Sequence, residues 1–115
     1  MLRQMLRSKI HRATLTGKHL EYEGSIGIDA ALLKAADILP GEKVEVVVLE
    51  NGARFQTYAI AGKPGEVSLN GAAARLAEVG DRVIVMAFGL VESREAAGVE
   101  PRIVRVDARN AVKKG

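Results

Sequence analysis

Short alternating apolar runs, separated by turn residues, are the feature that most limits what this chain can fold into. Segment 42–50 has valine at positions 44, 46 and 48, the pattern of a strand with one buried face. Asn51-Gly52 follows, and segment 54–60 is again strand-like, so the two segments predict a β-hairpin with a type I′ turn. A chain built from such units folds as sheet rather than as a helical bundle.

The rest of the chain repeats this pattern with few helical signals. Asp29 is a suitable N-cap for a short helix over 30–36, and 75–79 predicts a helical turn that Gly80 stops. Gly17 marks a turn. Further strands are expected in a mostly extended segment 1–16, and at 20–23, 26–28, 67–69, 81–88 and 103–106. About seven short strands with two or three short helices indicate a mainly-β fold, a small β-barrel whose closure removes exposed sheet edges.

Composition limits the class of protein. The 115 residues suit a single β-barrel domain spanning 1–115. Hydrophobic residues make up 48% and charged residues 27%, and apolar runs are short, so neither a transmembrane helix nor a membrane partner is expected. Residues 1–12 lack the apolar core and cleavage site of a secretory signal, which favours a cytoplasmic location.

Metal and thiol chemistry are not expected. The chain has no cysteine, and its two histidines, His11 and His19, are eight positions apart without clustered acidic residues. The formal net charge of +3 is scattered along the sequence and favours anionic partners only mildly. A nucleic acid and a small anionic substrate are both compatible with that charge.

Gly24-Ser25 is a dipeptide at which a chain can cut itself. The serine hydroxyl can attack the carbonyl carbon of the preceding residue and convert the amide into an ester. This shift requires a strained peptide, and glycine reaches such conformations at least cost. Elimination of the ester leaves dehydroalanine at position 25, which hydrolyses to a pyruvoyl group. A simple turn between strands 20–23 and 26–28 is the alternative interpretation of the same dipeptide.

Five motifs in register make the self-cutting interpretation specific. They are Lys9-Ile10-His11-Arg12, Tyr22-Glu23-Gly24-Ser25, Asn51-Gly52-Ala53-Arg54-Phe55, Thr57-Tyr58-Ala59-Ile60 and Asn70-Gly71-Ala72-Ala73-Ala74, the last followed by Val79-Gly80-Asp81. In order and spacing the chain resembles the pyruvoyl-dependent aspartate 1-decarboxylases, strongly over residues 1–90 and loosely to about residue 110. The tail from Glu92 is the least similar part.

The resemblance implies a fold, an assembly and an activity. The fold is a double-psi β-barrel in a homotetramer, and the chain is expected to cleave itself into 1–24, the β chain, and 25–115, the α chain. The activity is decarboxylation of L-aspartate to β-alanine and carbon dioxide for pantothenate, and hence coenzyme A, biosynthesis. The covalent cofactor is a pyruvoyl group derived from Ser25, which forms a Schiff base with the substrate amine and accepts the electrons that the departing carboxylate leaves. No maturation partner is assigned.

The resemblance also gives roles to individual residues. Tyr58 would return a proton to the α-carbon, since a phenol stays protonated near neutral pH. Lys9 and Arg54 would bind the two carboxylates of aspartate, without an assignment of which takes which. The alternative without catalysis is that Tyr58 packs its ring on the barrel and that Lys9 and Arg54 are solvated surface charges.

Self-cleavage and close substrate contact account for the remaining residues. Thr57 would support the Gly24 carbonyl and also lie beside the substrate, and Asn70 would steady the cleavage intermediate. Backbone N–H groups of Gly71, Ala72 and Ala73 would face the substrate, although Asn70-Gly71 is also an ordinary turn sequence. His11 and Tyr22 would support the site, whereas His19 lies outside the shared pattern and is expected to be exposed without a role.

Segment 54–58 raises a geometric question. In a regular strand Arg54 and Tyr58 share one face about 13 Å apart, while Thr57 points to the other face. If all three side chains reach one site, the strand must bulge, or the site must be shared by different faces or by different subunits.

Two rival functions remain possible for such a chain. A basic barrel that binds nucleic acid would stack bases on aromatic side chains, but the chain offers only Tyr22, Phe55, Tyr58 and Phe88, so no nucleic-acid partner is expected. A non-catalytic assembly module is disfavoured because the candidate catalytic residues occur together.

Overall fold

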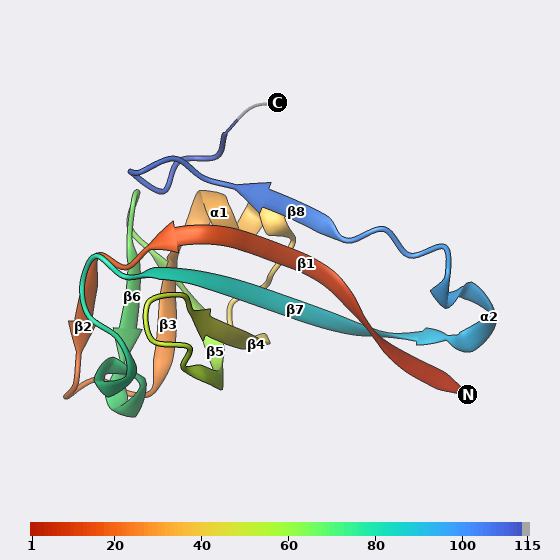
Figure 1. Cartoon of the computed structure of the whole chain (residues 1–115), viewed down its shortest axis with the longest axis horizontal. Helices are drawn as coiled ribbons and strands as arrows, with labels where there is room; N and C mark the ends of the chain where they lie inside the picture. The colour runs from red at the N-terminus through yellow and green to blue at the C-terminus, as the bar shows by residue number, and fades with distance from the viewer. Residues whose placement is uncertain (114–115) are drawn as a thin grey trace.

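The chain folds as eight strands and three short helices, in a computed structural model that describes residues 1–113. The elements in chain order are β1 (Leu2–Thr14), β2 (Gly17–His19), β3 (Ser25–Asp29), α1 (Ala30–Ala36), β4 (Lys43–Val48), β5 (Arg54–Gly62), β6 (Val67–Asn70), the 3-10 helix η1 (Gly71–Leu76), β7 (Arg82–Glu92), α2 (Ser93–Ala96) and β8 (Arg102–Arg105). Figure 1 shows β1 and β7 running out of the barrel as a long ribbon that ends near α2. The last two residues of the expected α chain lie outside the described residues.

The sheet closes on itself. Its strand order is β2-β6-β3-β5-β4-β7-β1-β8, and β1, paired with β7, continues almost directly into β2, which pairs with β6 at the other end. In that passage Leu15 N donates to Asp81 O (2.8 Å) and Thr16 N donates to Val67 O (2.7 Å). The predicted mainly-β class and small β-barrel with short helices are confirmed.

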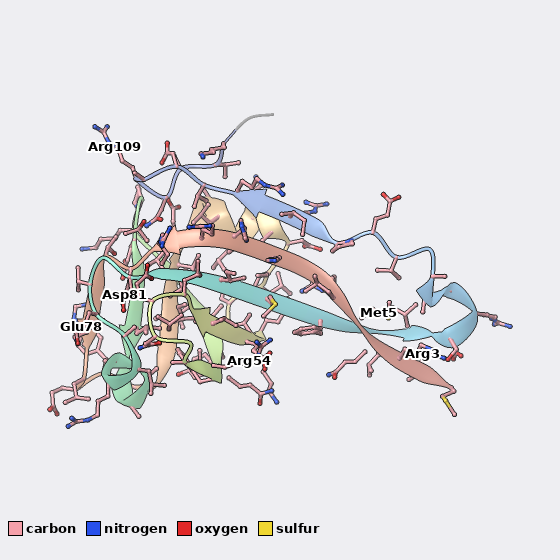
Figure 2. All side chains as sticks on the ribbon, viewed as in Figure 1. Arg3, Met5, Arg54, Glu78, Asp81 and Arg109 are labelled. Carbon is pink, nitrogen blue, oxygen red and sulfur yellow. The ribbon has the colours of Figure 1, made fainter. Side chains whose placement is uncertain are left out.

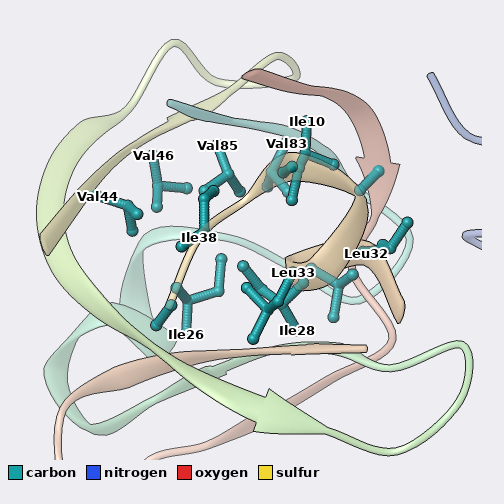
Figure 3. Packing of buried hydrophobic residues seen from close by; sticks show 14 of the residues in the cluster. Ile10, Ile26, Ile28, Leu32, Leu33, Ile38, Val44, Val46, Val83 and Val85 are labelled. Carbon is teal, nitrogen blue, oxygen red and sulfur yellow. The ribbon is translucent and has the colours of Figure 1, made fainter. Parts of the chain in front are cut away.

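Alternation in the sequence builds the core. The register aligns Val46, Val85, Ile10 and Val104 in one row across β4, β7, β1 and β8, and each of them is at most 5% exposed. Figure 3 shows the labelled members of this row pointing into the barrel together with side chains of α1. A fully buried side chain of this size stabilises the fold by about 1.5–3 kcal/mol, so the inward row fixes which face of each strand is buried.

Helix α1 forms where the sequence predicts it. Asp29 caps it, with Oδ1 accepting from Ala31 N at 2.8 Å, and Leu32 and Leu33 are buried against the barrel. Asp37 ends the helix in the left-handed conformation (φ 55°).

The expected strand over 20–23 is wrong, and the sheet topology explains why. β2 and β3 lie on opposite sides of β6, with His19 and Ser25 both paired to Asn70. The segment between them must therefore cross the end of β6, where no strand edge remains for it to pair with. Leu20 and Tyr22 are 44% and 64% exposed in consequence. Gly17 begins β2 rather than marking a turn.

The predicted hairpin is confirmed, but its turn type is wrong. A type I′ turn needs positive φ at both central residues, and only Gly52 has it (φ 73°). Gly52 N donates to Val48 O (2.9 Å), which closes a longer loop over 49–52. The Asn51 side chain holds this loop, because its Oδ1 accepts from Ala53 N (2.8 Å) and its Nδ2 donates to Leu76 O (2.7 Å).

Two helical segments differ from expectation. The turn expected at 75–79 lies upstream as η1, since the small residues after Asn70 can coil tightly and Ala77 is already extended.

The predicted strand 81–88 extends to Glu92 as β7, with alternating rather than continuous burial because its outer face is not covered. α2 was not predicted.

Candidate active site

The candidate cleavage site lies in the segment that crosses the end of β6. Gly24 is exposed at the end of this crossing, and Ser25, the first residue of β3, is only 2% exposed. The backbone is continuous through both residues, so the geometry is that of the uncleaved chain. The dipeptide therefore combines an accessible glycine with a buried serine.

Asn70 positions the Ser25 hydroxyl. The register pairs the two residues across β3 and β6, and Asn70 Nδ2 donates to Ser25 Oγ at 2.9 Å. Ser25 Oγ in turn donates to Glu23 O at 3.3 Å. Asn70 Oδ1 is buried and has no hydrogen-bond partner among residues 1–113. A buried acceptor left open is costly in a folded chain, which is typical of a site that receives another polar group.

Gly71 lies directly against the segment that crosses the end of β6. It has φ 69°, and a Cβ placed on it would lie 2.8 Å from Gly24 Cα, 2.8 Å from Gly24 N and 3.0 Å from Tyr22 O. Only a residue without a side chain fits both the conformation and the space. Ala72 is exposed beside it and Ala73 is half-buried, so η1 presents a small-residue surface at the cleavage site.

β5 runs beside β3 and brings two further candidates to the site. The two strands are parallel, with Ile26 opposite Ala59. Ser25 and Tyr58 are the residues just before the first pair of this ladder, and Thr57 precedes Tyr58 on β5. Tyr58 is 37% exposed on the outer face.

β5 has no bulge between residues 54 and 58. Its pairing with β4 is regular from Lys43↔Tyr58 to Val47↔Arg54. Thr57 is opposite the buried Val44, so its side chain lies on the inner face, while Arg54 and Tyr58 share the outer face. Of the two explanations for a common site, the bulge is excluded within this chain.

Arg54 already has a partner. Its Nε and Nη2 both lie 3.1 Å from Glu45 Oε2, across the β4–β5 hairpin. The Arg54 side chain is 60% exposed and extends away from the barrel in Figure 2. An exposed ion pair of this kind contributes little stability, so a carboxylate-bearing substrate can compete for the guanidinium.

Lys9 and His11 lie on β1, four strands from β3 in the sheet order. Neither is hydrogen-bonded to the Ser25 hydroxyl, whose partners are Glu23 O and Asn70 Nδ2. A β-bulge interrupts β1 here, with Arg12 in the left-handed conformation (φ 65°). Burial lowers the pKa of His11, and the nearby Lys9 lowers it further, which favours a neutral imidazole near neutral pH.

Two residues of the neighbourhood were missed by the sequence analysis. The His19 ring, expected to be exposed without a role, is exposed but stacks on the Tyr22 ring, with centroids 4.9 Å apart and planes at 27°. Glu45 was not considered as a partner of Arg54. The three-residue spacing of two aromatic rings at a turn could have signalled the first contact, whereas the second needs the hairpin register.

Metal ligands do not assemble in residues 1–113, since no group of three or more His, Asp or Glu side chains there could hold an ion. Within the same residues no helix is long and apolar enough to cross a membrane.

Comparison with known proteins bears directly on this site. The family model described as aspartate decarboxylase matches residues 1–113. A protein of Moorella thermoacetica named aspartate 1-decarboxylase is 54% identical over 120 residues, covering 100% of this chain and 94% of its own length. Proteins of the same name from Desulfitobacterium hafniense (56% identity, 96% of this chain, 88% of theirs) and Listeria innocua (53%, 97% and 90%) are similarly close.

Proposed function

The chain belongs to the aspartate decarboxylase family, and from this premise we propose how its own residues carry out the reaction. The protein is a carboxy-lyase that decarboxylates L-aspartate to β-alanine in pantothenate biosynthesis. The match over residues 1–113 is the observation that carries this assignment. The alternative of a nucleic-acid-binding barrel is not favoured.

We propose that the chain cleaves itself between Gly24 and Ser25 into 1–24 and 25–115. Ser25 Oγ bonds to the Gly24 carbonyl carbon as the C–N bond breaks, and the hydroxyl proton passes to the freed nitrogen. Loss of the α-proton then expels Gly24 as a carboxylate and leaves dehydroalanine at position 25. Water replaces the nitrogen, which departs as ammonia, and a pyruvoyl group heads the longer chain.

The residues around Ser25 fit this group. Asn70 Nδ2 donates to the serine oxygen in the uncleaved chain and remains a donor for an oxygen on the same residue after processing. The open Asn70 Oδ1 offers an acceptor at the same place. Thr57, on the strand that pairs with β3, has a hydroxyl suited to the oxyanion that would develop on the Gly24 carbonyl. When present, the pyruvoyl carbonyl supplies the electron sink for decarboxylation.

The chain's own side chains then bind aspartate and move a proton. Tyr58, on the outer face of the strand that pairs with β3, would return the proton to the α-carbon from its phenol. Arg54 on the same face offers a guanidinium fork to one carboxylate once it leaves Glu45. The backbone of Gly71, Ala72 and Ala73 borders the same place and lets a small substrate approach closely.

A second copy of the chain would complete the site. Lys9 and His11 lie four strands from Ser25, so we propose that they serve the cleavage centre of a neighbouring copy in a homotetramer. The ribbon of β1 and β7 projects from the barrel, with Arg3 and Met5 on it (Figure 2). It exposes Leu2 at 54% and Leu90 at 68%, an apolar surface of the kind that subunit contacts cover.

Mass spectrometry of the purified protein tests the proposal. We expect two fragments, 1–24 and 25–115, with a ketone on the longer one that reacts with a hydrazide. Ser25→Ala removes the attacking hydroxyl and should leave one intact chain without decarboxylase activity. Ser93→Ala is the matched control for self-cleavage, since Ser93 Oγ is bonded to Arg3 Nε and the Met1 carbonyl at the end of the β1–β7 ribbon. Full activity in an uncleaved Ser25→Ala chain would rule out a pyruvoyl group at position 25.

A further inference from the structure

The segment that carries the scissile bond is held by few contacts. Residues 20–24 form no ladder with any strand, because β2 and β3 occupy both sides of β6. The backbone of this segment makes one turn bond, from Tyr22 N to His19 O at 3.2 Å. Yet an acyl shift needs the Gly24 carbonyl held at the Ser25 hydroxyl, since small misplacements slow a reaction strongly.

The His19 ring supplies a further contact to this segment. It stacks on the Tyr22 ring at 4.9 Å, while the Tyr22 carbonyl lies above Gly71 and two residues before the scissile bond. His19 itself is fixed, since it ends β2 and pairs with Asn70, the residue that donates to Ser25 Oγ. The stack thus ties the unpaired segment before the scissile bond to a residue that is paired with Asn70, which positions the nucleophile.

We propose that His19 is a positioning residue for self-cleavage, acting through its stack on Tyr22. The inference rests on the proposed processing at Gly24-Ser25 and concerns its rate. The imidazole serves as a flat surface that holds the crossing segment in its bent path, so that fewer conformations compete with the reactive one. After cleavage the segment is a chain end, and the contact no longer sets the position of the electrophile.

Another contact of His19 must be separated from the stack. The His19 charge is one of the weaker causes that lower the pKa of Glu66, whose carboxylate accepts from Ser68 Oγ. If that charge were what mattered, an uncharged ring could not replace His19. If the stack matters, phenylalanine can.

The experiment compares the first-order rate of precursor cleavage in variants, followed by mass spectrometry from the uncleaved chain. His19→Ala should slow cleavage about threefold to tenfold, the range expected for loss of one stacked aromatic pair. His19→Phe should restore a rate near that of the unchanged chain. Leu20→Ala is the matched control, because Leu20 lies in the same segment, is 44% exposed and takes no part in the stack.

Two further measurements keep a folding defect from imitating this result. Tyr22→Leu removes the stack from the other side, and the double variant with His19→Ala should be no slower than the slower single variant if the two rings act together. Turnover per cleaved chain should stay unchanged in His19→Ala. Equal cleavage rates for His19→Ala and the unchanged chain, or a His19→Phe chain as slow as His19→Ala, would overturn the proposal. An unchanged chain that never cleaves would instead overturn the proposed function together with it.

Discussion

Replacing Gly71 by alanine tests whether close packing under the scissile bond controls processing. The new Cβ would lie 2.8 Å from both Gly24 Cα and Gly24 N, whereas carbon atoms ordinarily approach to about 3.5–4.0 Å. These are backbone atoms, so the crossing segment itself must move by roughly 0.7 Å or more. The left-handed conformation, φ 69°, adds about 1–2 kcal/mol for a residue with a side chain.

These two costs affect different measurements. The conformational cost lowers the melting temperature, by about 4–8 °C for a domain of this size. The displacement affects the alignment of nucleophile and carbonyl, and a misplacement near 1 Å can cost about 100-fold in rate. We therefore expect self-cleavage of the Gly71→Ala precursor to slow by about 30- to 100-fold, measured as fragment 25–115 accumulating over time.

Gly52→Ala is the matched control for Gly71→Ala. Gly52 has φ 73°, close to that of Gly71, but a Cβ there would meet nothing within 4 Å. It should show a similar fall in melting temperature and cleave at the unchanged rate. If Gly71→Ala also cleaved at the unchanged rate, contact between Gly71 and the crossing segment would have no part in positioning the scissile bond.

Asn70→Asp keeps the size of the side chain but removes the amide donor, so precursor cleavage should slow about tenfold or more; an unchanged rate would show that the donor is dispensable. Glu45→Gln releases Arg54 from its ion pair and should lower KM for aspartate by up to about fivefold, since an exposed pair contributes about 1 kcal/mol at most; a raised KM in a β-alanine assay would contradict this. The Ser68 hydroxyl is the largest cause that lowers the pKa of Glu66. The stabilisation of the fold by the bond from Ser68 to the Glu66 carboxylate is therefore present above the ordinary pKa of 4.5 and lost as pH falls through the lowered pKa. The difference in melting temperature between the unchanged chain and Ser68→Ala should accordingly narrow from about pH 6 to pH 3.

The barrel could be predicted from the sequence because its signals are local. Valine alternation and the Asn51-Gly52 break specify a hairpin without knowledge of any distant residue, and Asp29 specifies the start of α1. The segment over 20–23 shows the limit of such signals. Its alternation is that of a strand, but whether it pairs depends on β2 and β3 both taking the sides of β6, which no local pattern reveals.

The candidate site was likewise predictable only where its signals are local. The chemistry of Gly24-Ser25 and the family motifs point to one stretch of the sequence, yet the contact between Ser25 and Asn70 joins residues 45 positions apart. The role of Gly71 likewise appears only when the crossing segment is seen above it. The sequence spacing predicted that Arg54 and Thr57 lie on opposite faces of their strand. The regular β4–β5 register shows that no bulge brings them to the same face.

The arrangement divides the site into two parts with different requirements. Ser25, Asn70 and Gly71 meet within one barrel, so everything proposed for making the electrophile belongs to a single chain. Lys9, proposed as the second positive charge for a dicarboxylate, lies on β1, four strands from β3 in the sheet order. A barrel this small keeps its interior for packing, as the fully buried Val46 shows. We therefore expect its substrate site on the outer face that carries Arg54 and Tyr58.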